Sequence, residues 1–124
     1  MVGRRWLVAS ELEEQQAFRK RVYYAAPEVK LVAVPNAARR TQWEARRAKQ
    51  EGMATGFPDL MCIAPGGLIA FVEMKTHKGR VSEHQHEWIE RLNRYGFPAA
   101  VCRGADAAMA YLREQGFPIR ERAA

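Results

Sequence analysis

The sequence has few of the features that mark secreted, membrane or zinc-binding proteins. Of its 124 residues only two are cysteines, Cys62 and Cys102, and they do not share CxxC spacing. This spacing suggests neither a disulfide framework nor a zinc site, and it favours reduced core cysteines in an intracellular protein. The apolar run from Trp6 to Ala9 is too short for a signal peptide, and no run is long enough to cross a membrane.

The chain also has no internal repeat and no low-complexity segment. Its length suits one compact domain, which we predict over residues 1–124 with a core at about 10–116. Twenty Lys and Arg residues against 14 Asp and Glu give a net charge of +6. This excess favours a polyanionic partner such as nucleic acid, although charge alone is a weak signal.

The first half of the chain predicts a helix, a strand and a surface helix. Ser10 and Glu13 have capping-box spacing before a helix from about Glu11 to Ala26. A short β-branched run, Lys30 to Val34, then predicts a strand. Asn36 is suited to cap a helix rich in Ala and Arg that stops at Gly52.

The second half predicts a hairpin, a helix, a strand and a closing helix. Two apolar runs, Leu60 to Ala64 and Leu68 to Met74, flank the turn tripeptide Pro65-Gly66-Gly67. Ser82 and Gln85 repeat the capping-box spacing before a helix that stops at Gly96. A last strand is predicted at Ala99 to Arg103, and the helical crossover that joins it to the hairpin is long enough for a parallel βαβ unit. The last helix is predicted at Ala105 to Gln115.

The hairpin brings two carboxylates and one ammonium group together. Asp59 and Glu73 are equally far in sequence from Gly66, so simple register places them roughly opposite each other. Because strand side chains alternate, Glu73 and Lys75 share a face and Met74 points to the other. An acid pair on an apolar hairpin suits a divalent cation, beside which Lys75 would orient water or hold a phosphate.

An ordinary explanation stands beside the metal site. Glu73 and Lys75 would then form a salt bridge on an exposed strand face, with Asp59 serving the preceding turn. The charge pattern alone leaves both explanations open.

The motifs resemble a nuclease superfamily. Pro58-Asp59 followed by a hairpin and Glu73-Met74-Lys75 is similar to the PD-(D/E)xK pattern. More closely, the sequence resembles the VRR-NUC (virus-type replication-repair nuclease) family from about Ser10 to the closing helix. The matching segments are Gly56-Phe57-Pro58-Asp59-Leu60, Phe71-Val72-Glu73-Met74-Lys75-Thr76, Gly79-Arg80-Val81-Ser82 and Gln85.

This resemblance implies a fold and a site. The fold would be an α/β restriction-endonuclease-like core with a mixed sheet of about four strands flanked by helices. Asp59 and Glu73 would bind Mg²⁺ or Mn²⁺ with the Met74 carbonyl, and Lys75 would be catalytic. Gln85 resembles a glutamine that lines the site in the family, but its position also suits a simple capping partner for Ser82.

The family also uses a glutamate on the first helix, and three are candidates here. At about 100° per residue, Glu11 lies roughly 20° from the direction of Phe18, and Glu14 roughly 40° on the other side. Glu11 with Gln15 also matches the family's Glu-x-x-x-Gln pattern. We therefore predict Glu11, with Glu14 as the alternative and Glu13 as the capping-box partner. A first-turn acid favoured by the helix dipole is the ordinary explanation for Glu11.

Two basic segments predict DNA contacts. The segment before the Pro-Asp motif includes Trp43, which could stack on an unpaired base, and its charges would contact phosphates unless they form only a solvated face. The second segment follows Lys75. The predicted DNA-binding residues are Arg39, Arg40, Arg46, Arg47, Lys49, Lys78 and Arg80.

These patterns predict a Mg²⁺- or Mn²⁺-dependent DNA endonuclease. By resemblance, it would cut branched DNA such as a Holliday junction and act as a homodimer. It would be intracellular, in the bacterial cytoplasm or in a virus-infected host cell. One alternative is a non-catalytic nucleic-acid-binding module with the same fold, which has little use for carboxylates near a phosphate. The other is a restriction-type duplex endonuclease, for which the chain has little room for a base-reading region.

Overall fold

The computed structural model describes residues 10–35, 42–52 and 54–120; within the second helix the side chains of 45, 48 and 49 are not described. The elements follow in the order α1 (Glu11–Ala25), β1 (Lys30–Ala33), α2 (Gln42–Gln50), β2 (Leu60–Ala64), β3 (Leu68–Lys75), α3 (Glu83–Arg94), β4 (Ala99–Arg103) and α4 (Ala105–Glu114). Within the described residues, no helix is long and apolar enough to cross a bilayer.

The four strands form one mixed sheet in the order β1-β2-β3-β4. β1 pairs antiparallel with β2, and β2 with β3. β4 then pairs in parallel with β3 after the crossover through α3. The predicted hairpin and the predicted βαβ unit are both confirmed.

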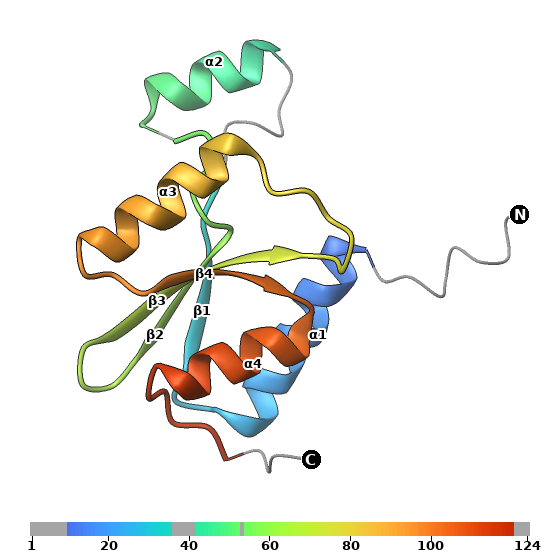
Figure 1. The fold of residues 1–124 in the computed structure, drawn as a ribbon, viewed down its shortest axis with the longest axis vertical. Helices are drawn as coiled ribbons and strands as arrows, with labels where there is room; N and C mark the ends of the chain where they lie inside the picture. The colour runs from blue at the N-terminus through green and yellow to red at the C-terminus, as the bar shows by residue number, and fades with distance from the viewer. Residues whose placement is uncertain (1–9, 36–41, 53, 121–124) are drawn as a thin grey trace, which may run out of the picture.

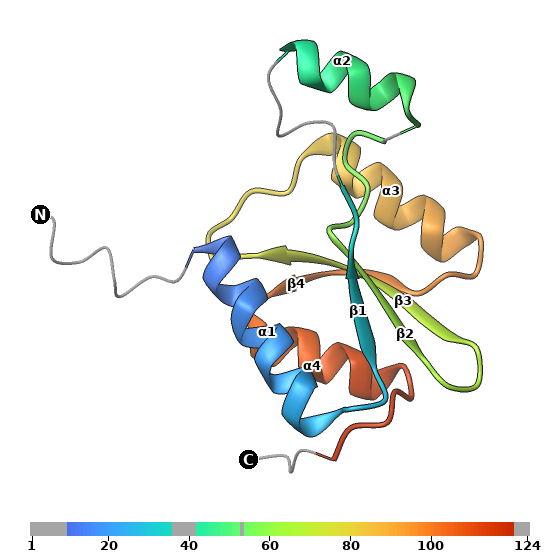
Figure 2. The same ribbon diagram turned by 180° about the vertical axis from the view of Figure 1, so that it is seen from behind.

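The helices cover both faces of the sheet (Figures 1 and 2). On one face, Phe18 and Val22 of α1 and Met109 and Leu112 of α4 pack in the main apolar core. On the other face, Leu92 of α3 packs with strand residues and with half-buried Trp88 and Ile89 in a smaller cluster. α2 lies beyond α3, and its described side chains are exposed.

Side-chain alternation along β3 divides its residues between the two faces. Val72 and Met74 belong to the main core with α1 and α4, whereas Phe71 belongs to the cluster with α3. Cys62 and Cys102 are free and buried in the main core, as the sequence predicts. Burial raises the pKa of each thiol from its ordinary value of 9.0 to about 12.

The helix starts follow from their caps. Ser10 accepts a hydrogen bond from the Glu13 backbone N–H at 3.1 Å, and its hydroxyl donates to Glu13 Oε1 at 3.2 Å. Ser82 and Gln85 form a complete capping box at α3. The predicted cap of α2, Asn36, lies outside the described residues.

Candidate functional site

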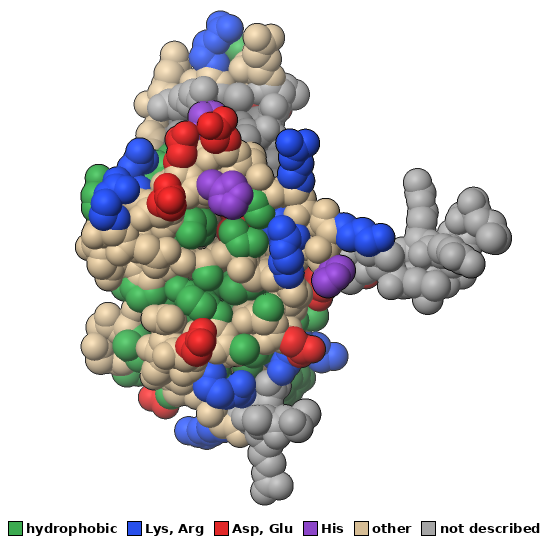
Figure 3. All heavy atoms as spheres, in the orientation of Figure 1, with side chains coloured by type: hydrophobic (Ala, Val, Ile, Leu, Met, Phe, Trp, Pro, Cys, Tyr) green, Lys and Arg blue, Asp and Glu red, His purple; other side chains and the backbone are tan. Residues whose placement is uncertain are grey.

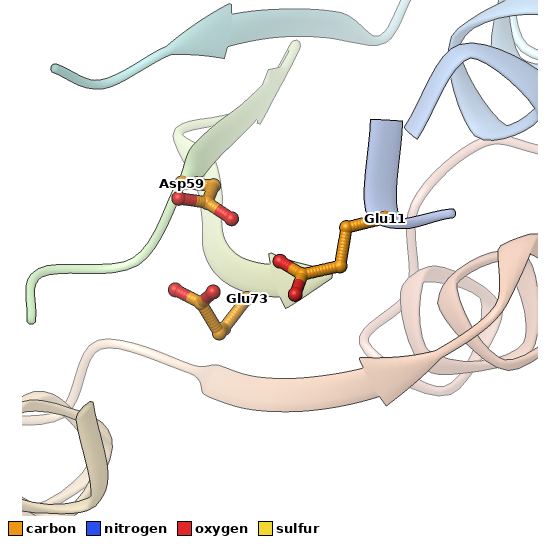
Figure 4. A group of neighbouring side chains, drawn as sticks. All are labelled: Glu11, Asp59 and Glu73. Carbon is orange, nitrogen blue, oxygen red and sulfur yellow. The ribbon is translucent and has the colours of Figure 1, made fainter. Parts of the chain in front are cut away.

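Three carboxylates from three separate elements converge at one end of the sheet. Glu11, Asp59 and Glu73 each offer an oxygen atom, and these three atoms lie within 4.8 Å of one another. Glu11 comes from the first turn of α1, Asp59 directly precedes β2, and Glu73 lies near the end of β3 (Figure 4). We call these three residues the acid cluster.

Strand pairing accounts for two members of the acid cluster. Leu60 pairs with Val72, so one further step of the same register places Asp59 opposite Glu73. The Asp59 carbonyl also accepts a hydrogen bond from the Val34 N–H at 2.8 Å, which ties this segment to the end of β1. Asp59 is 9% exposed and Glu73 is fully buried. Both carboxylates are therefore held by backbone structure and removed from most solvent.

The third member depends on how α1 packs. Glu11 reaches the acid cluster, while Glu13 contacts Ser10. Glu14 lies beside Gly104, where a methyl group in place of hydrogen would approach Glu14 Oε2 to 3.1 Å. All three candidate glutamates are described residues, and Glu11 is the one that the structure brings into the acid cluster.

Lys75 supplies a positive charge beside the acid cluster. Its side chain is buried, and its Nζ lies 3.9 Å from Glu11 Oε2. Met74, between the two charged residues of β3, instead points into the main core and is fully buried. This is the alternation that the sequence predicts, with Glu73 and Lys75 on one face.

Gln85 joins α3 to the acid cluster. Its Oε1 accepts a hydrogen bond from the Ser82 N–H at 2.9 Å, and its Nε2 donates to Glu73 Oε2 at 3.3 Å. The capping bond fixes which end of the amide faces the carboxylate. The two explanations weighed for Gln85 are thus compatible, because one side chain makes both contacts.

A close approach of two backbones holds this part of the site. Gly56 has φ +85°, and a side chain there would meet the backbone and Cβ of His84 at 2.7 Å. Only glycine allows the segment that leads to Asp59 to lie so close to the first turn of α3. Asp59 and Gln85 are consequently positioned by the same contact.

Arg103 is a positioning residue that no sequence motif indicates. Its Nη1 donates to the carbonyl oxygens of Thr76, His77 and Gly79 at 3.0, 3.3 and 2.6 Å. Arg103 pairs with Lys75 across β4 and β3, so it holds the loop that leaves β3 directly after Lys75. No sequence motif predicts bonds from a guanidinium to backbone carbonyls 24 to 27 residues away.

The predicted DNA-contacting residues fall into three groups. Lys78 and Arg80 are exposed in the loop that Arg103 holds, and Lys, Arg and His side chains gather over this loop in Figure 3. Arg46 and Arg47 are exposed on α2, where Arg47 lies 5.6 Å from the Trp43 ring centre and 3.3 Å from Glu51 Oε1. Arg39, Arg40 and the side chain of Lys49 lie outside the described residues.

The donor set of the acid cluster fits a hard divalent cation. Three carboxylate oxygens within 4.8 Å repel one another unless a positive charge lies among them. Mg²⁺ and Mn²⁺ prefer oxygen ligands and bind through a few carboxylates with water in the other positions. The cluster contains no His or Cys, which are the usual ligands of zinc.

Comparison with known proteins identifies the family. The family model for the VRR-NUC domain matches residues 4–106. The chain belongs to the VRR-NUC family. The match covers the acid cluster, Lys75 and Gln85, so the resemblance in the sequence motifs is confirmed, and the chain carries a nuclease-family domain.

Two solved VRR-NUC structures share the fold. One, titled a VRR_NUC domain protein, has a TM-score of 0.70 and 20% identity over 87% of this chain and 88% of its own. The other, titled a VRR_NUC domain, has a TM-score of 0.59 and 22% identity over 86% and 97%. No curated protein matched the chain. Together with the mixed sheet, these likenesses confirm the predicted restriction-endonuclease-like core.

Proposed function

We propose that this chain is a divalent-metal-dependent DNA endonuclease that hydrolyses phosphodiester bonds at the acid cluster. The observation that carries the proposal is the meeting of Glu11, Asp59 and Glu73 within 4.8 Å, beside the buried ammonium group of Lys75. Membership of a nuclease family supports the same conclusion.

Each side chain has a defined part in this proposal. Glu11, Asp59 and Glu73 would hold Mg²⁺ or Mn²⁺, with the Met74 carbonyl as a further oxygen ligand. When bound, the cation lowers the pKa of an attacking water and neutralises the charge that develops on the phosphate. Lys75 binds a phosphate oxygen or orients the water, because burial fixes its ammonium group in place. Gln85 holds Glu73 by its amide and thereby fixes that carboxylate.

The chemistry of the site favours catalysis over simple binding. A protein that only binds DNA gains affinity from positive charges near phosphates and loses it from carboxylates. Among the described residues, three carboxylates lie next to one buried lysine, Lys75. A non-catalytic binding module remains the second candidate, and a restriction-type enzyme the third.

The proposal also covers the preferred DNA structure and the oligomeric state. We take branched DNA, such as a Holliday junction, as the preferred substrate, and a homodimer as the active form, since cutting two strands requires two sites. We propose phosphate contacts for the exposed side chains of Lys78, Arg80, Arg46 and Arg47. The sequence predicts the same contacts for Arg39, Arg40 and Lys49.

Cleavage of labelled DNA tests the proposal. Wild type and Lys75→Ala are compared on a four-way junction, a flap and a plain duplex, in Mg²⁺, Mn²⁺ or chelator. We expect metal-dependent cutting by wild type, fastest on the junction, and a loss of roughly a hundredfold or more in the variant. Tight binding with no cutting by wild type in any metal would favour the binding module, and cuts at one short duplex sequence would favour the restriction-type enzyme.

A further inference from the structure

Two neighbouring tyrosines project from the C-terminal half of α1. Tyr23 and Tyr24 are each 73% exposed, and their rings meet edge to face with centroids 5.1 Å apart. Neither ring belongs to the cores on the two faces of the sheet. A single exposed aromatic ring is common on a protein surface, but two adjacent rings in contact form a ready stacking platform.

A basic groove lies on each side of the tyrosine pair. One, of about 540 Å³, is lined by Tyr23 together with Arg19, Val22, Pro27, Val29, Lys30 and Leu31. The other, of about 440 Å³, is lined by Tyr24 together with Lys20, Arg21, Ala25 and Arg120. Five cationic side chains therefore line the two grooves, and none of the described lining residues is acidic. Among the described residues, Arg21 forms an ion pair with Asp106 at the edge of the second groove.

This combination of groups selects one kind of occupant. Lys and Arg bind phosphates, and tyrosine rings stack on unpaired bases whatever their sequence. A second copy of the chain would bring the same five cations against these five, which like-charge repulsion disfavours. We propose that this surface, which we call the tyrosine surface, binds a nucleic-acid strand with unpaired bases.

The tyrosine surface lies at the C-terminal end of α1, whereas Glu11 of the acid cluster lies in the first turn of the same helix. Figure 2 shows the course of α1 between these two ends. From Glu11 to Tyr24 the helix rises about 20 Å at 1.5 Å per residue. That length corresponds to about six nucleotides at the 3.4 Å spacing of a duplex strand. The inference rests on the proposed function in one respect: it gives the DNA substrate a second contact, on a single-stranded stretch away from the cut.

DNA affinity in chelator measures this contact without any cutting. Fluorescence anisotropy with a labelled 30-nucleotide single strand compares wild type with Tyr23→Ala/Tyr24→Ala. Because stacking on one aromatic side chain contributes about 1–3 kcal/mol, we expect Kd to rise at least roughly fivefold. Tyr95→Ala is the matched control, since Tyr95 is 63% exposed and also lies beside an arginine, Arg94. This control should leave Kd unchanged.

Photocrosslinking locates the contact directly. An oligonucleotide carrying 5-iododeoxyuridine should crosslink to Tyr23 or Tyr24 in wild type, as identified by mass spectrometry of the peptides. Equal Kd values for the double variant and Tyr95→Ala, with no crosslink on α1, would overturn the proposal. So would a dimer that dissociates in the double variant while DNA affinity stays the same, because the surface would then bind a second copy.

The outcomes separate this inference from the proposed function. If wild type cuts DNA but the tyrosine variant binds as wild type does, the second contact fails and the nuclease stands. If wild type cuts nothing but its DNA affinity depends on the tyrosines, the nuclease fails and the tyrosine surface stands. Circular dichroism of the variant checks that its fold is intact, which is expected because both side chains are largely exposed.

Discussion

The Gln85 side chain has two roles, one in the cap of α3 and one at the acid cluster. Its Oε1 completes the capping box of α3, and its Nε2 donates to Glu73. Glutamate in place of glutamine would keep the oxygen that caps Ser82 but would remove the donor and add a negative charge beside the acid cluster. The two roles can therefore be separated by one substitution.

We expect Gln85→Glu to lower cleavage by roughly tenfold or more while α3 stays capped. Ser82→Ala is the complementary variant, because it costs the capped helix about 1 kcal/mol but leaves the Gln85 amide in place. Steady-state cleavage and thermal unfolding of both variants check this. Equal losses of activity in the two variants would mean that Gln85 acts only through the helix cap.

Residue patterns predicted part of the site and left part of it open. The hairpin symmetry around Gly66 was enough to set Asp59 opposite Glu73, because register in a short hairpin is local. Glu11 required the direction of a helix face, which periodicity gives only to within tens of degrees, and the packing of α1 against β3 decides it. Arg103 gave no signal, since its partners are backbone carbonyls that look alike in any sequence.

At the scale of elements, local signals set nearly all boundaries. Every predicted helix and strand with described residues is present, and the ends of α1, β1, α3 and α4 agree to within two residues. Ser and Gly caps and Pro breaks fix these ends locally. Local signals do not predict contacts between an element and a distant loop. The hydrogen bonds from Arg103 of β4 to the loop between β3 and α3 are an example.

Arg103 should control that loop. Arg103→Ala removes three hydrogen bonds to the carbonyls of Thr76, His77 and Gly79, so amide hydrogen exchange over residues 76–80 should quicken. Because the loop carries Lys78 and Arg80, we expect KM for DNA to rise by roughly fivefold or more and kcat to change less. Arg94→Ala, an exposed arginine on α3, is the control. Unchanged exchange and unchanged KM would show that the loop needs no such anchor.

At the scale of the whole molecule, the buried cysteines link stability to pH. The pKa of Cys62 and of Cys102 is about 12 in the folded protein, mainly because of burial, against an ordinary value of 9.0. The folded state therefore keeps its thiol protons at a pH where the unfolded chain loses them. The two buried thiols therefore contribute to the free energy of unfolding. This contribution is fully present below pH 9 and is lost as the pH rises from 9 toward 12.

Urea unfolding at pH 8 and pH 10.5 measures this effect. Between the two pH values, the free energy of unfolding should fall more for wild type than for Cys62→Ala/Cys102→Ala. The extra fall in wild type is the contribution of the two thiols. Lys titration affects both proteins alike, so it cancels in the comparison. Identical pH dependence in the two proteins would show that the thiols are ionised as easily in the fold as outside it.

The fold and the family followed from sequence because the hairpin, the caps and the motif residues agree with one another along the chain. The tyrosine surface could not be predicted from the sequence, because Tyr23 and Tyr24 occupy helix positions that periodicity alone assigns to an ordinary solvent-exposed face. Only the grooves that α1 forms with the segments at 27–31 and at Arg120 reveal the positive charge around them.

If the acid cluster holds the catalytic cation, Glu11 is required for cutting, and Glu14 provides a matched control. Cleavage of a labelled junction is measured over a Mg²⁺ titration for Glu11→Gln and for Glu14→Gln, two glutamates one helical turn apart. We expect Glu11→Gln to lose cutting by roughly a hundredfold, or to need much higher Mg²⁺ for it, while Glu14→Gln behaves as wild type does. Equal cutting by both variants at every Mg²⁺ concentration would show that the acid cluster does not hold the catalytic cation.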